Sequence, residues 1–244
     1  MNERRSEMIT LPVKNSEERY TVAPSKLIAL GLNYRAHIAE SVSVMVKGFT
    51  DEVPAEPLLF PKTPNVLIGP DAAIVIPRFL KDYGFADLRT DYEAELALII
   101  GRHCKDVPVE SAMDCIFGYT CMNDVSQRNI QNGDRTGWYR GKSLDTFGPI
   151  GPRVVLARDL PDPQNLAIRC RLNGRTVQEA NTRQMIFDIP HIVAFVSKNF
   201  TLLPGDIILT GTPSGVGPLS HGDTVEVDIE QIGVLKNTVV DETV

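Results

Sequence analysis

Three carboxylates stand two residues apart beside the most apolar stretch of the sequence. Asp91, Glu93 and Glu95 lead into the run 96–100, and residues two apart in a β-strand share a face. The run is apolar on both faces, as in a buried strand. Like charges packed together in a buried setting repel, and a bound cation would relieve that repulsion. Oxygen ligands without a nearby Cys or His favour Mg²⁺, Mn²⁺ or Ca²⁺ over zinc.

The alternative for this segment is a solvated strand end that carries three exposed acids. A fourth acid favours the metal interpretation. Asp124 comes at the end of the mostly apolar stretch 117–125, where a lone surface aspartate would be unusual.

A histidine and a glutamate are spaced for a shared helical face. His37 and Glu40 lie three residues apart, so in a helical turn their side chains can form a hydrogen bond. A carboxylate that orients an imidazole fixes its tautomer and raises its basicity, which suits a general base. The alternative is an ordinary ion pair on a surface helix. The other three histidines, at 103, 191 and 221, are expected to be structural or solvated.

Candidates for anion binding follow later in the chain. The glycine-rich loop 211–217 comes directly after an apolar run and can direct backbone N–H groups and the Thr212 hydroxyl at an anion. It is neither a Walker A loop nor a dinucleotide fingerprint, and a tight turn is the commoner explanation. Lys142 and Arg128 are either ion-pair partners of the acids or cations that hold an anionic substrate beside the metal.

Short apolar runs separated by glycine and proline predict the elements that would position these residues. The pattern predicts an α+β fold with many strands and few helices, and not a βαβ repeat. Residues up to 24 are expected to be irregular. A helix is predicted over 109–116, and another over 189–199 with Asp188 as its cap. The predicted strands are 26–31, 58–60, 66–68, 94–100, 207–210 and 225–229.

Composition excludes several other classes of protein. The chain has 244 residues, 43% of them hydrophobic and 23% charged, with a formal net charge of -6. This balance argues against disorder and against a surface that neutralises nucleic-acid phosphates. No apolar run approaches the roughly 18 residues that span a bilayer, and the charged N-terminus does not resemble a secretory signal. The four cysteines form no C-x-x-C pair. We therefore expect a cytoplasmic protein without nucleic-acid or membrane partners.

The ordered set of motifs resembles the fumarylacetoacetate hydrolase family from about residue 26 to the C-terminus. No single motif is specific, but their order along the chain is. The matching segments are Gly31-Leu32-Asn33-Tyr34 with His37 and Glu40, Leu59-Phe60-Pro61-Lys62, Tyr92-Glu93-Ala94-Glu95-Leu96, Gly118-Tyr119-Thr120 with Asn123-Asp124, Lys142-Ser143-Leu144-Asp145-Thr146, Asn173-Gly174 through Gln178, Leu203-Pro204-Gly205-Asp206 and Gly211-Thr212-Pro213.

The resemblance implies roles for individual residues. It implies a divalent metal, Mg²⁺ with Mn²⁺ or Ca²⁺ as alternatives, held by Glu93, Glu95 and Asp124. Asp91 is then expected behind these ligands or exposed. The catalytic residues would be His37, Glu40 and Lys142, and the substrate-binding residues Arg128, Gln131 and Thr212. Gln127 stands where the family usually has a small residue, and Leu144 where Phe is common.

The resemblance also implies a fold and an assembly. It implies a mixed β-sandwich roll, like the C-terminal domain of fumarylacetoacetate hydrolase, with flanking helices, and a homodimer. We expect a short N-terminal arm over residues 1–24 and a single catalytic domain over residues 25–244. The separate N-terminal domain that many members carry is expected to be absent or vestigial.

The hypothesis for function is a Mg²⁺-dependent hydrolase that cleaves a C–C bond of a 2,4-dioxo acid of the acylpyruvate or fumarylpyruvate type, through an enolate that the metal stabilises. A decarboxylase or isomerase of 2-oxo dicarboxylates, of the 2-hydroxyhepta-2,4-diene-1,7-dioate isomerase type and active in aromatic catabolism or on oxaloacetate, is the alternative. The choice is expected to depend on the pocket walls over 41–56. A third alternative is a dicarboxylate-binding protein without catalysis.

Overall fold

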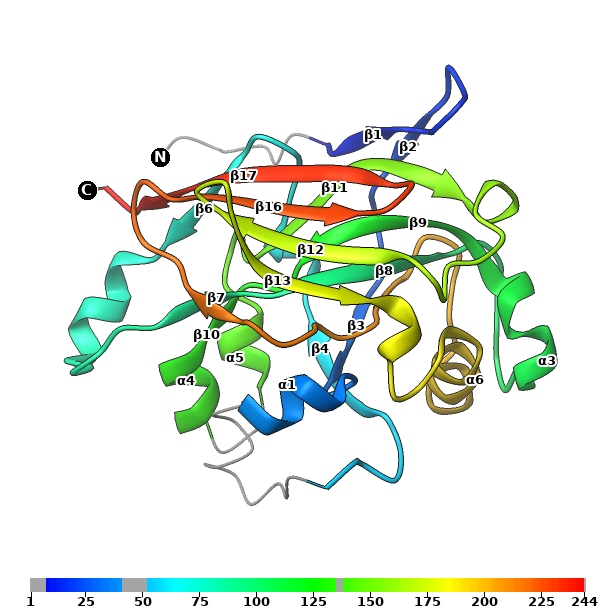
Figure 1. Ribbon diagram of the computed structural model, residues 1–244, viewed down its shortest axis with the longest axis horizontal. Coiled ribbons are helices and arrows are strands. Elements are labelled where there is room, and N and C mark those ends of the chain that lie inside the picture. The colour runs from blue at the N-terminus through cyan, green and yellow to red at the C-terminus, as the bar shows by residue number, and fades with distance from the viewer. Residues whose placement is uncertain (1–7, 41–51, 135–137, 244) are drawn as a thin grey trace.

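The structure is a computed structural model that describes residues 8–40, 52–134 and 138–243. Within these ranges two large β-sheets pack face to face, with short helices at their ends (Figure 1). The predicted α+β sandwich roll is therefore confirmed. No helix in the described part of the chain is long and apolar enough to cross a bilayer.

The larger sheet has seven strands in the order β4-β3-β14-β8-β9-β11-β5. Its central strand β8 pairs antiparallel with both β14 and β9. The strands are β3 (Leu27–Gly31), β4 (Leu58–Lys62), β5 (Leu67–Ile68), β8 (Ala94–Ile100), β9 (Ile116–Asn123), β11 (Gly148–Leu156) and β14 (Ile207–Leu209).

A second sheet of five strands covers one face of the first, in the order β13-β12-β16-β17-β6. Its strands are β6 (Ala73–Ile76), β12 (Ala167–Leu172), β13 (Arg175–Asn181), β16 (Thr224–Ile229) and β17 (Gly233–Asp241). A small three-stranded sheet joins β7 (Thr90–Tyr92) with β10 (Ser126–Gln127) and β15 (Gly217–Pro218).

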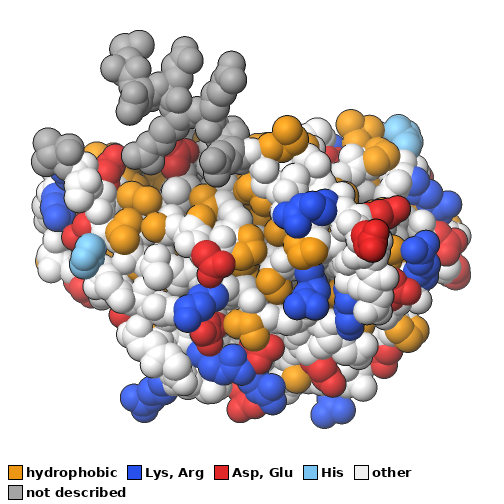
Figure 2. All heavy atoms as spheres, turned by 90° about the horizontal axis from the view of Figure 1, so that it is seen from above, with side chains coloured by type: hydrophobic (Ala, Val, Ile, Leu, Met, Phe, Trp, Pro, Cys, Tyr) orange, Lys and Arg blue, Asp and Glu red, His pale blue; other side chains and the backbone are white. Residues whose placement is uncertain are grey.

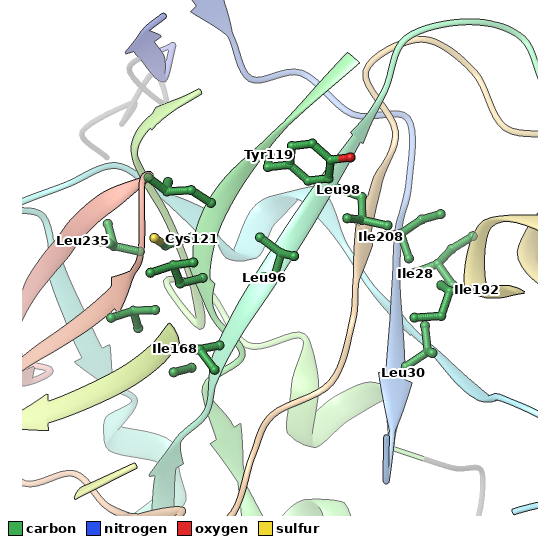
Figure 3. Close-up of a cluster of buried hydrophobic side chains, with 14 of the residues drawn as sticks. Ile28, Leu30, Leu96, Leu98, Tyr119, Cys121, Ile168, Ile192, Ile208 and Leu235 are labelled. Atoms are coloured by element: carbon green, nitrogen blue, oxygen red, sulfur yellow. The ribbon is translucent and has the colours of Figure 1, made fainter. Parts of the chain in front are cut away.

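The alternation of side chains along β8 explains why its sequence is apolar throughout. Leu96 and Leu98 point into the cluster between the two sheets, where Ile168 of β12 and Leu235 of β17 meet them (Figure 3). Ala97 and Ile99 point into a second buried cluster on the opposite face. A strand buried on both faces has no solvated positions, so every residue of β8 is buried.

Five α-helices lie in the described residues, and α1, α4 and α5 gather near one end of the larger sheet (Figure 1). They are α1 (Arg35–Glu40), α3 (Val109–Ala112), α4 (Arg128–Gly133), α5 (Tyr139–Lys142) and α6 (Ile189–Asn199). The 3₁₀ turns are η1 (Pro64–Val66), η2 (Arg78–Tyr83), η3 (Met113–Cys115), η4 (Ala157–Asp159) and η5 (Thr182–Gln184).

The helix predicted over 189–199 is confirmed. The Asp188 side chain accepts the backbone N–H of His191, and Pro190 occupies the first turn. The helix predicted over 109–116 is too long, because α3 ends at Ala112, the 3₁₀ turn η3 follows and β9 begins at Ile116.

The N-terminal residues are more regular than predicted. Residues within the segment expected to be irregular form an antiparallel hairpin of β1 (Thr10–Pro12) and β2 (Arg19–Thr21). Leu11 is the reason, because its side chain is buried in the same cluster as Leu27 and Ala29 of β3. The domain boundary placed after residue 24 stays a prediction.

Charged side chains of both signs are interspersed on the face that Figure 2 shows. Isolated apolar side chains lie among them on that face, which is normal for a folded protein.

Candidate functional site

The three carboxylates predicted to bind metal converge. Glu93, Glu95 and Asp124 each offer an oxygen, and these oxygens all lie within 4.8 Å of one another. All three side chains are buried. Three closely spaced carboxylate oxygens without sulfur or imidazole form the donor set that hard divalent cations require, so these residues fit a divalent metal. A solvated strand end is excluded.

The junction of β7, β8 and β9 creates this cluster. The backbone N–H of Glu93 donates to the Asn123 side chain at 2.9 Å, and the N–H of Asp124 donates to the Glu93 carbonyl at 2.8 Å. These bonds join the start of β8 to the end of β9. Glu95 lies on the face of β8 that carries Ala97 and Ile99, away from the five-stranded sheet.

Two buried lysines contact the same carboxylates. Lys142 Nζ lies 2.6 Å from Glu93 Oε2 and 2.6 Å from Asp124 Oδ2. Lys62 Nζ lies 2.6 Å from Asp124 Oδ1 and also donates to the Lys142 carbonyl at 2.5 Å. Lys142 also lies over the Phe60 ring, with Nζ 4.8 Å from its centroid. The cations therefore lie against the acid cluster and not at a separate place.

The surrounding charges shift the pKa values of Glu93 and Glu95 in opposite directions. Burial raises the pKa of Glu95 well above its ordinary value, and the nearby Asp124 and Glu93 carboxylates raise it further. Burial acts on Glu93 in the same direction, but Lys142 and Arg128 outweigh it and hold the pKa of Glu93 well below its ordinary value. Burial opposes the charged form of Lys142 too, but Asp124 and Glu93 raise the pKa of Lys142 above its ordinary value.

Asp91 is not exposed, and it contacts the site through Arg128. Its side chain is fully buried. Arg128 Nε donates to Asp91 Oδ2 at 2.8 Å, and the same guanidinium donates to Glu93 Oε1. Arg128 is thereby fixed between Asp91 and the acid cluster. Its Nη1 also donates to Gln131 Oε1 at 2.9 Å.

The predicted His37–Glu40 pair is present on α1. His37 Nδ1 lies 3.3 Å from Glu40 Oε1, and His37 is buried while Glu40 is partly exposed. The Gly215 backbone N–H donates to Glu40 at 2.7 Å. Burial raises the pKa of Glu40, but the bonds from His37 and Gly215 outweigh it and leave that pKa below its ordinary value.

The glycine-rich loop binds the chain's own carboxylates. The Gly211 N–H donates to Glu95 Oε2 at 2.7 Å, while Gly215 holds Glu40. The loop therefore links the acid cluster to the His–Glu pair. Gly215 has φ +94°, and a Cβ there would lie 2.1 Å from the Val177 carbonyl oxygen, so only glycine fits.

Gln131 and Thr212 line the small cavity around the acids. The Thr212 hydroxyl donates to the Ala94 carbonyl and accepts from the Gln178 side chain, both at 2.9 Å. Gln127, which departs from the family pattern, caps α4 by accepting the Ile130 N–H. It therefore orients the helix that carries Gln131.

Two cavities adjoin at this place. The smaller has about 20 Å³, and Glu93, Glu95, Lys142 and Trp138 are among the residues that line it. This is room for about one water-sized group. The larger has about 360 Å³ and is lined by Glu40, Arg89 and Val216, among others. His37 and Arg128 line both cavities. Residues 41–51, within the segment expected to form pocket walls, lie outside the described residues.

The remaining histidines are not at this site. His191 pairs with Asp188, His221 accepts the Asp241 N–H, and His103 is exposed. Two further residues at the site, Lys62 and Arg89, were not predicted from the sequence. For Lys62 a signal existed, since it stands two residues after Phe60 and so lies on the same face of the strand. Arg89 pairs with the nearby Asp91, but no local pattern indicated its place at the site, because Arg128, whose backbone N–H it accepts, is distant in sequence.

The comparison with protein families agrees with this geometry. Residues 26–240 match the model of the fumarylacetoacetate (FAA) hydrolase C-terminal domain. The chain belongs to the fumarylacetoacetate hydrolase family.

The relatives of this chain are named for several different activities. The mitochondrial oxaloacetate tautomerase fahd2 of Xenopus laevis is 41% identical over 227 residues, covering 89% of this chain and 66% of the relative. The structure is similar to that of 2-hydroxyhepta-2,4-diene-1,7-dioate isomerase from Mycobacterium marinum, with TM-score 0.77 and 40% identity, covering 93% of this chain and 79% of that one.

A third relative is a fumarylpyruvate hydrolase from Pseudomonas aeruginosa, whose structure is in complex with Mn²⁺ and pyruvate. It matches with TM-score 0.80 and 28% identity, covering 96% of this chain and 97% of that one. The prediction of an enzyme of the fumarylacetoacetate hydrolase family is confirmed. The named relatives include hydrolases, an isomerase and a tautomerase, so the family alone does not define the reaction.

Proposed function

We propose that this protein is a divalent-metal-dependent hydrolase that cleaves the C–C bond of a 2,4-dioxo acid of the acylpyruvate type. The observation that carries the proposal is that His37, which is paired with Glu40, lines both the small acidic cavity and the larger one beside it. A base at this junction faces the region where a substrate held at the acids would extend. The Mn²⁺ and pyruvate in the fumarylpyruvate hydrolase structure support the same metal chemistry.

Glu93, Glu95 and Asp124 would hold Mg²⁺, with Mn²⁺ as the alternative. When bound, the metal would supply Lewis-acid polarisation of the 2-oxo acid end of the substrate. Lys142 is placed beside the same carboxylates, so its ammonium would balance negative charge that develops at this end. Arg128, Gln131 and Thr212 line the small cavity and would orient the bound acid.

The His37–Glu40 pair would move the proton. With Nδ1 bonded to Glu40, His37 would use Nε2 to accept a proton from water. The oxygen of that water would bond to C4 of the substrate, and the C3–C4 bond would break. C4 leaves as a carboxylic acid, and C3 takes a proton to become the methyl group of pyruvate. One water is consumed for each bond broken.

A second candidate is tautomerisation of a 2-oxo dicarboxylate, and the oxaloacetate tautomerase relative favours it. This reaction moves a proton between C3 and the 2-oxo oxygen and needs no water. Decarboxylation would also depend on the metal and on Lys142 to balance the negative charge that develops at the 2-oxo end. The native metal, the homodimer, the cytoplasmic location and a role in aromatic catabolism stay predictions.

The experiment is a panel assay with product identification on an acylpyruvate, fumarylpyruvate and oxaloacetate. It would be run with Mg²⁺, with Mn²⁺ and after chelation. The proposal expects pyruvate and a carboxylic acid, lost on chelation and restored by metal. Keto–enol interconversion without C–C cleavage would favour the tautomerase. Metal-dependent binding without turnover would favour a binding protein.

A further inference from the structure

The larger cavity contains a cation that the proposed mechanism does not use. This cavity of about 360 Å³ shares His37 and Arg128 with the small cavity at the acids. Its remaining lining includes Arg89 and the apolar side chains of Phe85, Ala86 and Val216. A ligand that begins at the acids can therefore continue past Arg128 along an apolar wall toward Arg89.

Arg89 is joined to the acid cluster through three successive ion pairs. Arg89 Nε lies 2.8 Å from Asp91 Oδ1, and Asp91 Oδ2 lies 2.8 Å from Arg128 Nε. Arg128 in turn contacts Glu93. Asp91 therefore lies between the two arginines, and Arg89 is the one farther from the acid cluster.

The position of Arg89 is fixed before any ligand binds. Its backbone N–H donates to the Asn129 side chain at 2.9 Å, and its carbonyl accepts the Arg128 N–H at 2.9 Å. The side chain is 36% exposed and uses Nε for Asp91. Within the described ranges, no hydrogen bond occupies its two terminal nitrogens. A guanidinium offers five N–H donors in a planar fork that matches a carboxylate.

Once a divalent metal is bound, the net charge of the acids and cations around the two cavities would be balanced by a ligand that carries two negative charges. With Glu95 ionised, as metal binding requires, four carboxylates balance four cations; they are Glu93, Glu95, Asp124 and Asp91, against Lys62, Lys142, Arg128 and Arg89. A divalent metal would add two positive charges. A 2-oxo monocarboxylate cancels one of them, whereas a dicarboxylate cancels both. Glu40 and Asp87 also line the larger cavity, but Glu40 is paired with His37 and Asp87 is exposed.

We propose that Arg89 binds a second carboxylate at the far end of the substrate, and that this protein therefore prefers 2-oxo dicarboxylic acids to monocarboxylic ones. The inference rests on the proposed function for binding of the 2-oxo end at the acids, and it adds Arg89 as the residue that binds the far carboxylate. Phe85, Ala86 and Val216 would contact the carbon chain between the two acids.

The test is calorimetric binding of two acids that differ only at the far end. 2-Oxoheptanedioate and 2-oxoheptanoate have the same chain length, and neither has the 4-oxo group that hydrolysis requires. With Mn²⁺ present, the wild-type protein should bind the dicarboxylate at least tenfold more tightly, as expected for a charge-assisted bidentate pair. In Arg89→Gln the two affinities should agree within about twofold, and Arg89→Lys should keep part of the difference.

Arg169→Gln is the matched control. Arg169 is also partly exposed and also pairs through Nε with a carboxylate, Glu179, at 2.8 Å, but it lies outside both cavities. This variant should keep the wild-type preference, and thermal unfolding would check that each variant folds. Equal binding of both acids by the wild-type protein, or a preference that survives in Arg89→Gln, contradicts the role of Arg89 but not the proposed function. A wild-type protein that binds neither acid contradicts the proposed function as well.

Discussion

The ammonium of Lys62 lies 2.6 Å from Asp124 Oδ1, and both side chains are fully buried. Lys62 also donates to the Lys142 carbonyl. One lysine therefore positions both a carboxylate of the acid cluster and the backbone of the second lysine. The arrangement is costly, because burial outweighs the attraction of Asp124 and leaves the pKa of Lys62 below its ordinary value.

Replacing Lys62 by methionine should lower the free energy of unfolding by about 3 kcal/mol, since it removes one partner of a buried ion pair. It should also weaken Mn²⁺ binding, because Asp124 loses a contact that orients it. Chemical denaturation and metal titration measure the two effects. Lys236→Met is the control, since Lys236 is exposed and lies 3.7 Å from Glu226; a change below about 1 kcal/mol is expected there. A similar change for both variants would contradict this assignment.

Stabilisation of the protein by metal should increase with pH. Burial, with Asp124 and Glu93, raises the pKa of Glu95 above its ordinary value of 4.5. Between 4.5 and the raised pKa, the folded protein holds a proton that the unfolded chain has released, so stability without metal falls as pH rises. A divalent cation replaces this proton. Glu93 has the opposite sign, because its lowered pKa gives stability that is lost only as pH falls below its ordinary range.

Thermal unfolding with and without Mn²⁺, from about pH 5 to about pH 8, measures this linkage. The shift in Tm on adding Mn²⁺ should grow over this range in the wild-type protein. In Glu95→Gln the growth should be much smaller, because this side chain carries no titrating proton. A Tm shift that is the same at every pH would contradict the role of Glu95.

His37→Gln should lower the rate of hydrolysis by about 10² to 10⁴, the usual contribution of a general base. Its Mn²⁺ affinity should stay within about threefold of wild type, because His37 is not one of the three clustered acids. Glu40→Gln should have a smaller effect on rate, since it removes the carboxylate that orients His37 but leaves the imidazole. Steady-state assays and metal titration measure both. Full hydrolytic activity in His37→Gln would show that another group is the base.

Gly141→Ala should disturb the site through packing. A Cβ at Gly141 would lie 2.7 Å from the Gln131 backbone nitrogen and 2.8 Å from the Gln127 carbonyl oxygen. Because these are backbone atoms, α5 would move away from α4 and displace Lys142, and a loss of about 1 to 3 kcal/mol in stability is expected. Gly133→Ala is the control, since a Cβ there meets nothing within 4 Å. Chemical denaturation compares the two, and equal stability would contradict the close approach.

Much of the site could be predicted because its residues carry strong local signals. Glu93 precedes a strand buried on both faces and Glu95 lies within it, so their charges had to be compensated. His37 and Glu40 have helical spacing, and α1 forms there. The α6 boundaries were predictable from the Asp188 cap and the amphipathic pattern after it.

The rest depended on contacts between distant segments. Leu11 makes the N-terminal hairpin pack onto β3, and nothing near residue 11 indicates that contact. The helix predicted over 109–116 ended early because Ile116 pairs with Ile100 as the first residue of β9, and that pairing overrides local propensity. Arg89 lies beside Arg128 only because β7 pairs with β10.

The most direct test of the proposed reaction is cleavage of fumarylpyruvate in water enriched in oxygen-18, with Mn²⁺ present. The account predicts pyruvate and fumarate, with one heavy oxygen in a fumarate carboxylate. It also predicts that Glu93→Gln and chelated wild-type protein give neither product above background. Products that form equally well without metal or in Glu93→Gln, or recovery of the uncleaved acid, would contradict it.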